Sequence, residues 1–244
     1  MNEKKVVSLL IALCLSASIT VSCYADAEIN NSTIISHDPL GKLFIRQATG
    51  DINNCGPIAA FVARQFSTQR FKVKNLNSSI ATARTLITPL SPEEIEDNLS
   101  YTDDSKFDSR WWHTGDIKRY LTQHQVPISP LNIQQGTQAL LKELDKGNIM
   151  IINVNMNDLP QQNGATNIGK PYLTFPIPGG WGHFLVIVGY QYIDNRLVFQ
   201  IHDSVSNKGK NRLFYAANIV HAVKRYSPEI IVINKGKSTT LAAK

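Results

Sequence analysis

Apolar positions follow a helical period in the first half of the chain and a strand-like pattern in much of the second half. Apolar residues that recur every three or four positions predict amphipathic helices. Such stretches lie at 55–66, at 80–99, from Thr114 onward, at 137–146 and at about 215–225. Apolar runs that predict strands lie at 149–154, 183–190, 196–202 and 229–234. Helices followed by mainly antiparallel strands predict an α+β fold.

Polar, turn-rich stretches separate these elements, at 26–50, 67–79, 103–112 and 157–180. The run 183–190 is apolar on both faces of a strand. One face carries His183, Leu185 and Ile187, and the other carries Phe184, Val186 and Val188. A strand with two apolar faces is typical of the centre of a sheet that is covered on both sides.

The N-terminus has the pattern of a secretory signal peptide. A short charged segment is followed by the mostly apolar, uncharged run 6–21 and by small residues that suit cleavage after Ala25. The apolar run is shorter than the ~20 residues of a membrane span. We therefore expect a signal peptide at 1–25 and one domain at 26–244, with a frayed tail from about 235. A lipoprotein signal with Cys23 as the lipidated residue is the alternative.

Loss of the signal peptide would remove Cys14 and Cys23 and leave Cys55 as the only cysteine. An exported protein with one cysteine has no internal disulfide, so its thiol is buried and inert, intermolecular or chemically used. An idle thiol is a liability in an oxidising compartment, which favours chemical use.

Charge and composition exclude several classes of function. The formal net charge of +6 falls to +5 without Lys4, Lys5 and Glu3, and neither a dense basic run nor a basic-aromatic stripe is present. Specific nucleic-acid binding is therefore not expected. No two histidines have metal-ligand spacing, so we expect neither a metal nor a cofactor. The protein is expected outside the cytoplasm, secreted or periplasmic, and a monomer is favoured.

Cys55 is followed by Gly56, Pro57 and an apolar helical run. Proline suits the first turn of a helix, which places Cys55 at the helix start. The helix dipole and the unbonded N–H groups there favour a thiolate. A buried and inert cysteine at the start of a core helix is the alternative.

A nucleophilic thiol needs a base, and the base needs a group that orients it. His183 begins a predicted strand directly after a glycine-rich loop, and Gly180, Trp181 and Gly182 are expected to line the substrate cleft. By period two, Asp203 ends an apolar row on the next strand. A fold at Ile193 sets His183 opposite Asp203, although the expected turn lies one or two residues away, so a bulge or a wider loop has to absorb the offset.

The other histidines are weaker candidates. His202 points to the face opposite Asp203 and is interpreted as a solvated strand residue. The remaining four are placed in loops or on helix surfaces, at His37, His113, His124 and His221.

The segments "NNCGPIAAFVA", "GGWGHFLVIVGY" and "IHDS", in this order, resemble the papain-like cysteine peptidases. The branch that they resemble most is the bacteriocin-processing, double-glycine-leader type. The resemblance covers roughly 47–234, and it implies a papain-like fold with the nucleophile at a helix start and His and Asp on the sheet. It also implies a glutamine five or six residues before the cysteine that helps form the oxyanion hole. Gly50 and Thr49 stand there, which leaves Gln47 or Asn53 as the donor.

Together these features predict a cysteine peptidase or isopeptidase with a triad of Cys55, His183 and Asp203 and a peptide or protein substrate. One alternative is amide or acyl transfer on the same triad, by a transglutaminase-like crosslinker or a cell-wall peptide amidase. Another is a catalytically silent papain-like binding protein, which the missing glutamine favours.

Overall fold

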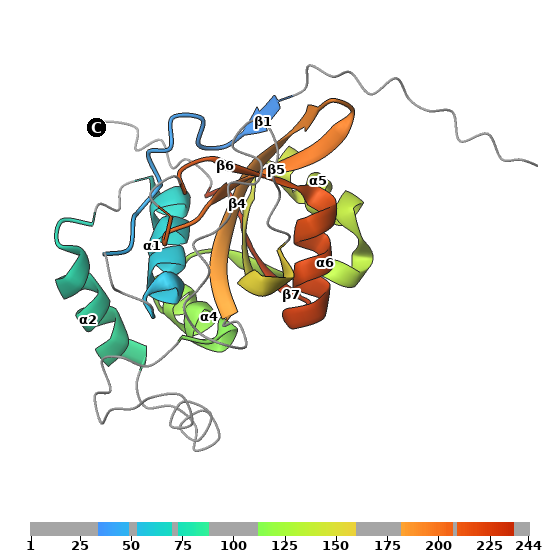
Figure 1. Cartoon of the computed structure of the whole chain (residues 1–244). Coiled ribbons are helices and arrows are strands. Elements are labelled where there is room, and N and C mark those ends of the chain that lie inside the picture. Colours follow the sequence, from blue (N-terminus) through green and yellow to red (C-terminus); the bar gives the residue numbers. More distant parts are fainter. Residues whose placement is uncertain are drawn as a thin grey trace, which may run out of the picture. The chain divides into compact units, whose positions relative to one another are not determined.

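Within the described residues, seven strands form one sheet in which every neighbouring pair is antiparallel. Figure 1 shows how the helices and strands are arranged. The sheet order is β2 (Ile128–Asn132), β7 (Glu229–Ile233), β3 (Ile149–Asn155), β4 (Gly182–Ile193), β5 (Arg196–His202) and β6 (Arg212–Tyr215), while β1 (Ile34–Ser36) pairs with the outer half of β4. This computed structural model describes residues 34–48, 53–69, 73–87, 112–159, 182–206 and 209–236.

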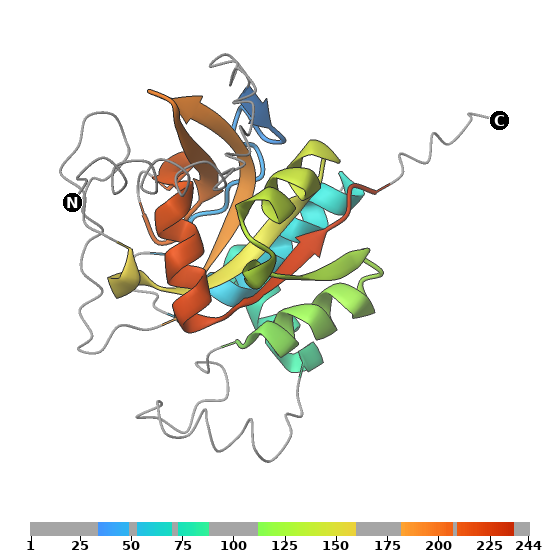
Figure 2. The same cartoon turned by 90° about the vertical axis from the view of Figure 1, so that its right-hand side faces the viewer.

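Helices cover both faces of the sheet, as the two views in Figures 1 and 2 show. One face packs against α1 (Cys55–Thr68) and α4 (Thr114–Gln123), and α2 (Leu76–Ile87) packs on these two helices. The other face packs against α5 (Thr137–Asp145) and α6 (Ala216–Tyr226). Two short 3₁₀ helices, η2 (Ile133–Gln135) and η3 (Met156–Asp158), complete the described elements. The predicted α+β class is confirmed.

The central strand β4 separates two hydrophobic cores, as its two apolar faces predict. Phe184, Val186 and Val188 belong to the core under α1, and Leu185 and Ile187 belong to the core under α5 and α6. Burial of both faces holds the start of β4 rigidly, and this is where His183 lies.

The hairpin of β4 and β5 turns at Asp194 and Asn195, which both have positive φ. This is the turn that matches the right-handed twist of two paired strands. The register shifts by one residue between Ile187 and Gly189, so the predicted irregularity is a bulge within β4. Gly189 has no room for a side chain there, because a Cβ would lie 2.2 Å from the carbonyl oxygen of Ile35 in β1.

Several local expectations were wrong. The stretch 26–50 was expected to be turn-rich, but β1 forms within it; β2 and β6 were also not predicted. The helix α2 begins at Leu76, inside the expected connector 67–79. Thr114 is the first residue of α4 and not its cap, because His113 and Asp116 form the capping box.

Some expectations lie outside the described residues. These are the signal peptide 1–25, the part of 80–99 after residue 87, most of the loops 103–112 and 157–180, and the tail after residue 236. All described residues belong to one compact unit that spans 31–244. Within the described ranges, no helix combines the length and the apolar character needed to cross a bilayer.

Candidate active site

Cys55 is the first residue of α1, and its side chain is a buried free thiol, 4% exposed. Chain packing around it is tight. A Cβ on Gly56 would lie 2.7 Å from the Cβ of Trp112, two residues before the start of α4. The preceding residue, Asn54, is the N-cap of α1 but makes no side-chain cap hydrogen bond. The thiol therefore lies at a helix N-terminus that no N-cap side chain covers.

His183 and Asp203 lie together at the end of the sheet. The Nε2 atom of His183 is 2.8 Å from Oδ1 of Asp203, and the two side chains are 1% and 0% exposed. The same Oδ1 accepts a second hydrogen bond from the N–H of Val205, at 3.2 Å. Nε2 is therefore the ring nitrogen that faces the carboxylate.

The surroundings of His183 favour its protonated form. Burial by itself opposes the charge, but the hydrogen bond to Asp203 and the neighbouring Cys55 outweigh burial and raise the pKa of the imidazole to about 10.

Arg212 supplies a second cation beside Asp203. Its Nη1 lies 3.8 Å from Oδ2 of Asp203, and both side chains are buried. The guanidinium also lies over the ring of Phe214, with 5.1 Å from its carbon to the ring centroid. A buried carboxylate is costly unless it is paired, and Asp203 is paired on both sides.

Gln47 and Asn53 differ in their surroundings. Gln47 is 3% exposed; its N–H donates to the carbonyl of Ser204 at 2.8 Å, and the Ser204 hydroxyl donates to its Oε1 at 3.2 Å. A glutamine whose oxygen is held in this way presents its NH₂ group on the other side. Asn53 is half-buried, and its carbonyl accepts a hydrogen bond from Arg84 at 3.2 Å. These contacts hold Gln47 against Ser204, the residue that follows Asp203, and hold the carbonyl of Asn53 against α2.

The expected cleft residues Gly180 and Trp181 lie outside the described residues. Gly182 is the first residue of β4 and pairs with Asn155 of β3. It therefore lies directly before His183, at the N-terminal end of β4.

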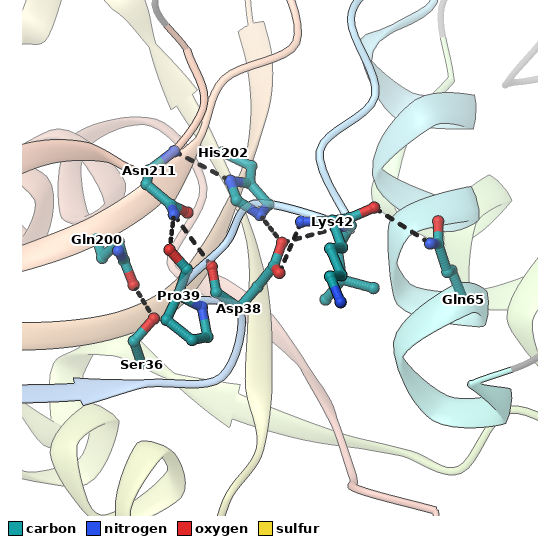
Figure 3. A network of polar contacts seen from close by, with 9 residues as sticks. Ser36, Asp38, Pro39, Lys42, Gln65, Gln200, His202 and Asn211 are labelled. Carbon is teal, nitrogen blue, oxygen red and sulfur yellow. Dashed lines mark hydrogen bonds and ion pairs between the residues drawn. The ribbon is translucent and has the colours of Figure 1, made fainter.

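The interpretation of His202 as a solvated residue was wrong. His202 is buried, and its Nε2 is 2.9 Å from Oδ2 of Asp38 (Figure 3). Asn211 donates its N–H to Nδ1 of His202 at 3.3 Å and its side-chain amide to the carbonyl of Asp38 at 3.0 Å. The ring of Phe44 packs edge-on against His202. Segment 34–48 covers this face of β5, and no local pattern of residues indicates that cover.

The Asp38 carboxylate also fixes its own loop. It accepts the N–H groups of Lys42 and Leu43 at 2.8 and 2.7 Å (Figure 3). Burial opposes its ionisation, but the hydrogen bonds from His202, Leu43 and Lys42 outweigh burial and lower the pKa of the Asp38 carboxyl. The same segment carries Gln47, the candidate oxyanion donor. The network therefore connects this segment to the end of β5, directly before Asp203.

Two buried arginines near the site were not predicted from the sequence. Arg212 was missed because β6 was not predicted, and Arg84 because nothing local to α2 links it to the residues before Cys55. In both cases the partners are brought together by the tertiary fold.

No protein-family model matches the chain, and no curated protein does either. The structure is similar to the crystal structure of a "putative C39-like peptidase" from Bacillus anthracis, with a TM-score of 0.52 and 13% sequence identity. The match covers 84% of this chain and 100% of that chain. The fold is papain-like. At this identity the similarity establishes the fold alone.

Proposed function

We propose that the protein is a cysteine hydrolase that cleaves a peptide or isopeptide bond with Cys55, His183 and Asp203. One observation carries this proposal: the buried His183, whose electrostatic neighbours include the thiol at the start of α1, is hydrogen-bonded at 2.8 Å to a buried carboxylate. A nucleophile, a base and an orienting group in this order are what acyl transfer requires. A buried structural cysteine needs none of these partners.

In the proposed reaction, the Cys55 thiolate attacks the carbonyl carbon of the scissile bond. The negative charge passes to the carbonyl oxygen, where the N–H of Cys55 and the side-chain amide of Gln47 stabilise it. The C–N bond then breaks, and the His183 imidazolium gives its proton to the leaving amine. Water attacks the thioester, His183 takes a proton from it, and the thiolate leaves. Asp203 holds the imidazole and balances its charge throughout.

The test compares Cys55→Ala and His183→Asn with the wild type on a synthetic mixture of peptides, with products read by mass spectrometry. Both variants are expected to lose cleavage by at least ~100-fold, since each removes a member of the reacting pair. His221→Asn is the matched control, because His221 is exposed on α6. Wild-type cleavage by Cys55→Ala would overturn the proposal.

The same assay with an added primary amine separates hydrolysis from transfer. Hydrolysis yields a free carboxylate, whereas a transferase forms the amide of the added amine. A second readout is alkylation of Cys55 by iodoacetamide across pH. An activated thiolate reacts well below pH ~8.5, and a titration like that of a free thiol contradicts the activation of Cys55.

We further propose that the protein is exported and that its first 25 residues are removed. The proposal rests on the charged start, the apolar run and the small residues before Asp26. N-terminal sequencing of protein recovered from the periplasm and the medium of a bacterial host is expected to begin at Asp26. Recovery of the intact N-terminus from the cytosol contradicts export.

A further inference from the structure

Arg84 is a buried cation beside the candidate nucleophile. It lies near the end of α2, and the residue is only 3% exposed to solvent. Its Nη2 donates to the carbonyl of Asn53 at 3.2 Å and to Oδ1 of Asn54 at 2.5 Å. The guanidinium is therefore hydrogen-bonded to both of the residues that directly precede α1.

Asn54 is in the position where an asparagine normally caps a helix. The N-cap side-chain oxygen usually accepts a hydrogen bond from the N–H of the second or third helical residue. The third helical residue here is Pro57, which has no N–H, so only the N–H of Gly56 could receive such a cap. Asn54 makes no side-chain cap hydrogen bond: Arg84 holds its Oδ1, and its backbone (φ −99°, ψ 8°) is not in the extended conformation of a capping residue.

An uncapped N-terminus is useful at this place in the fold. A cap by Asn54 would use the N–H of Gly56 and bring an oxygen atom against the helix end where the Cys55 thiol lies. When Arg84 keeps the Oδ1 atom of Asn54 away from the helix end, the N–H groups and the positive end of the helix dipole can stabilise the thiolate and the oxyanion.

We propose that Arg84 is a positioning residue that holds the Asn54 side chain away from the N-terminus of α1 and so keeps the N–H groups beside Cys55 open for the reaction. This inference rests on the proposed function. In this role Arg84, a residue of α2, affects the reaction at Cys55 without itself contacting the substrate.

The test is a double-mutant cycle with Arg84→Met, Asn54→Ala and the double variant. In Arg84→Met the Oδ1 of Asn54 is released to cap the helix, so we expect kcat to fall about tenfold with KM within about twofold of the wild type. The pH midpoint of Cys55 alkylation by iodoacetamide is expected to rise in the same variant. Asn54→Ala has no oxygen to cap with and is expected to stay close to the wild type.

The double variant decides the question. It lacks both the arginine and the capping oxygen, so kcat and the alkylation midpoint are expected to return toward the wild-type values. A merely structural Arg84 predicts a double variant at least as impaired as Arg84→Met. That result overturns the proposal, and so does an Arg84→Met variant with unchanged kcat and alkylation.

Two controls keep the outcomes distinct. Arg225→Met removes an arginine with a largely exposed side chain on α6 and is expected to change nothing. Should Arg84→Met fail to fold in a thermal melt, Arg84→Lys replaces it, with and without Asn54→Ala, and the same directions are expected. Failure of the proposed function is seen separately, because Cys55→Ala would then retain full activity.

Discussion

Replacement of Asp203 by asparagine tests how His183 is held in its charged form. The Asp203→Asn variant keeps the size of the side chain and an oxygen that can accept from Nε2, but it loses the negative charge. The charge is the part that matters, because the 2.8 Å hydrogen bond joins two side chains that water does not reach.

The expected size of the effect follows from this geometry. A hydrogen bond between charged partners stabilises a protein by ~1.5–3 kcal/mol, against about half as much for neutral partners. The difference, ~0.75–1.5 kcal/mol, therefore lowers the pKa of His183 by about half to one pH unit. Cys55 still raises the pKa of the ring in the variant, so the value stays above that of a free histidine.

Stability should respond with the matching sign. A folded-state pKa that is raised to about 10 contributes stability that is fully present below pH ~6.5 and is lost as the pH rises through about 10. In Asp203→Asn this contribution is lost at a lower pH. At neutral pH the variant also loses ~3–5 kcal/mol of stability, because the cations of His183 and Arg212 no longer face a carboxylate.

The assay is an NMR titration of the histidine side chains in ¹⁵N-histidine-labelled protein, with thermal melts at each pH. We expect a His183 midpoint near 10 in the wild type and a midpoint about half to one pH unit lower in the variant. Asp194→Asn, in the exposed turn of the same hairpin, is the control. A folded variant whose His183 midpoint is unchanged or higher refutes the reasoning.

Two further predictions concern the segment 34–48. Gln47→Leu is expected to lower kcat by ~10²-fold with little change in KM, while alkylation of Cys55 by iodoacetamide, which forms no oxyanion, keeps its rate; a parallel loss of alkylation would indicate a structural role for Gln47 instead. His202→Phe leaves the Asp38 carboxylate buried without its imidazole partner, so a loss of ~2–4 kcal/mol in unfolding free energy is expected from urea melts. A variant as stable as the wild type would show that the Asp38–His202 network adds no stability.

Elements with strong local patterns could be read from the sequence. The helix that starts at Cys55, the helix-Gly-strand unit around Gly147 and the hairpin that turns at Asp194 and Asn195 all appear where the pattern places them. Their signals are a helical or two-residue period bounded by turn residues, and a period is a property of neighbouring residues. The strands β1, β2 and β6 were missed, and all three are short and lie at the ends of the sheet or beside its central strand.

The candidate site likewise has features that the sequence predicts and features that it does not. Cys55, His183 and Asp203 each lie at the end of a predicted element, so their residue types and their order in the chain could be singled out before any contact was known. The bulge that brings His183 diagonally within reach of Asp203 could be anticipated only as an offset to be absorbed, since a register depends on where the ladder is interrupted.

The surroundings of these residues were decided by the tertiary structure alone. Arg84 meets Asn54 across 30 residues, and Asp38 meets His202 across 164. No local period records such a contact, because it depends on which surfaces the helices and the segment 34–48 cover. The sequence by itself therefore determined which groups could carry chemistry. The packing of distant segments determined their burial and their charge partners, because a buried charge must find its partner wherever the fold brings one.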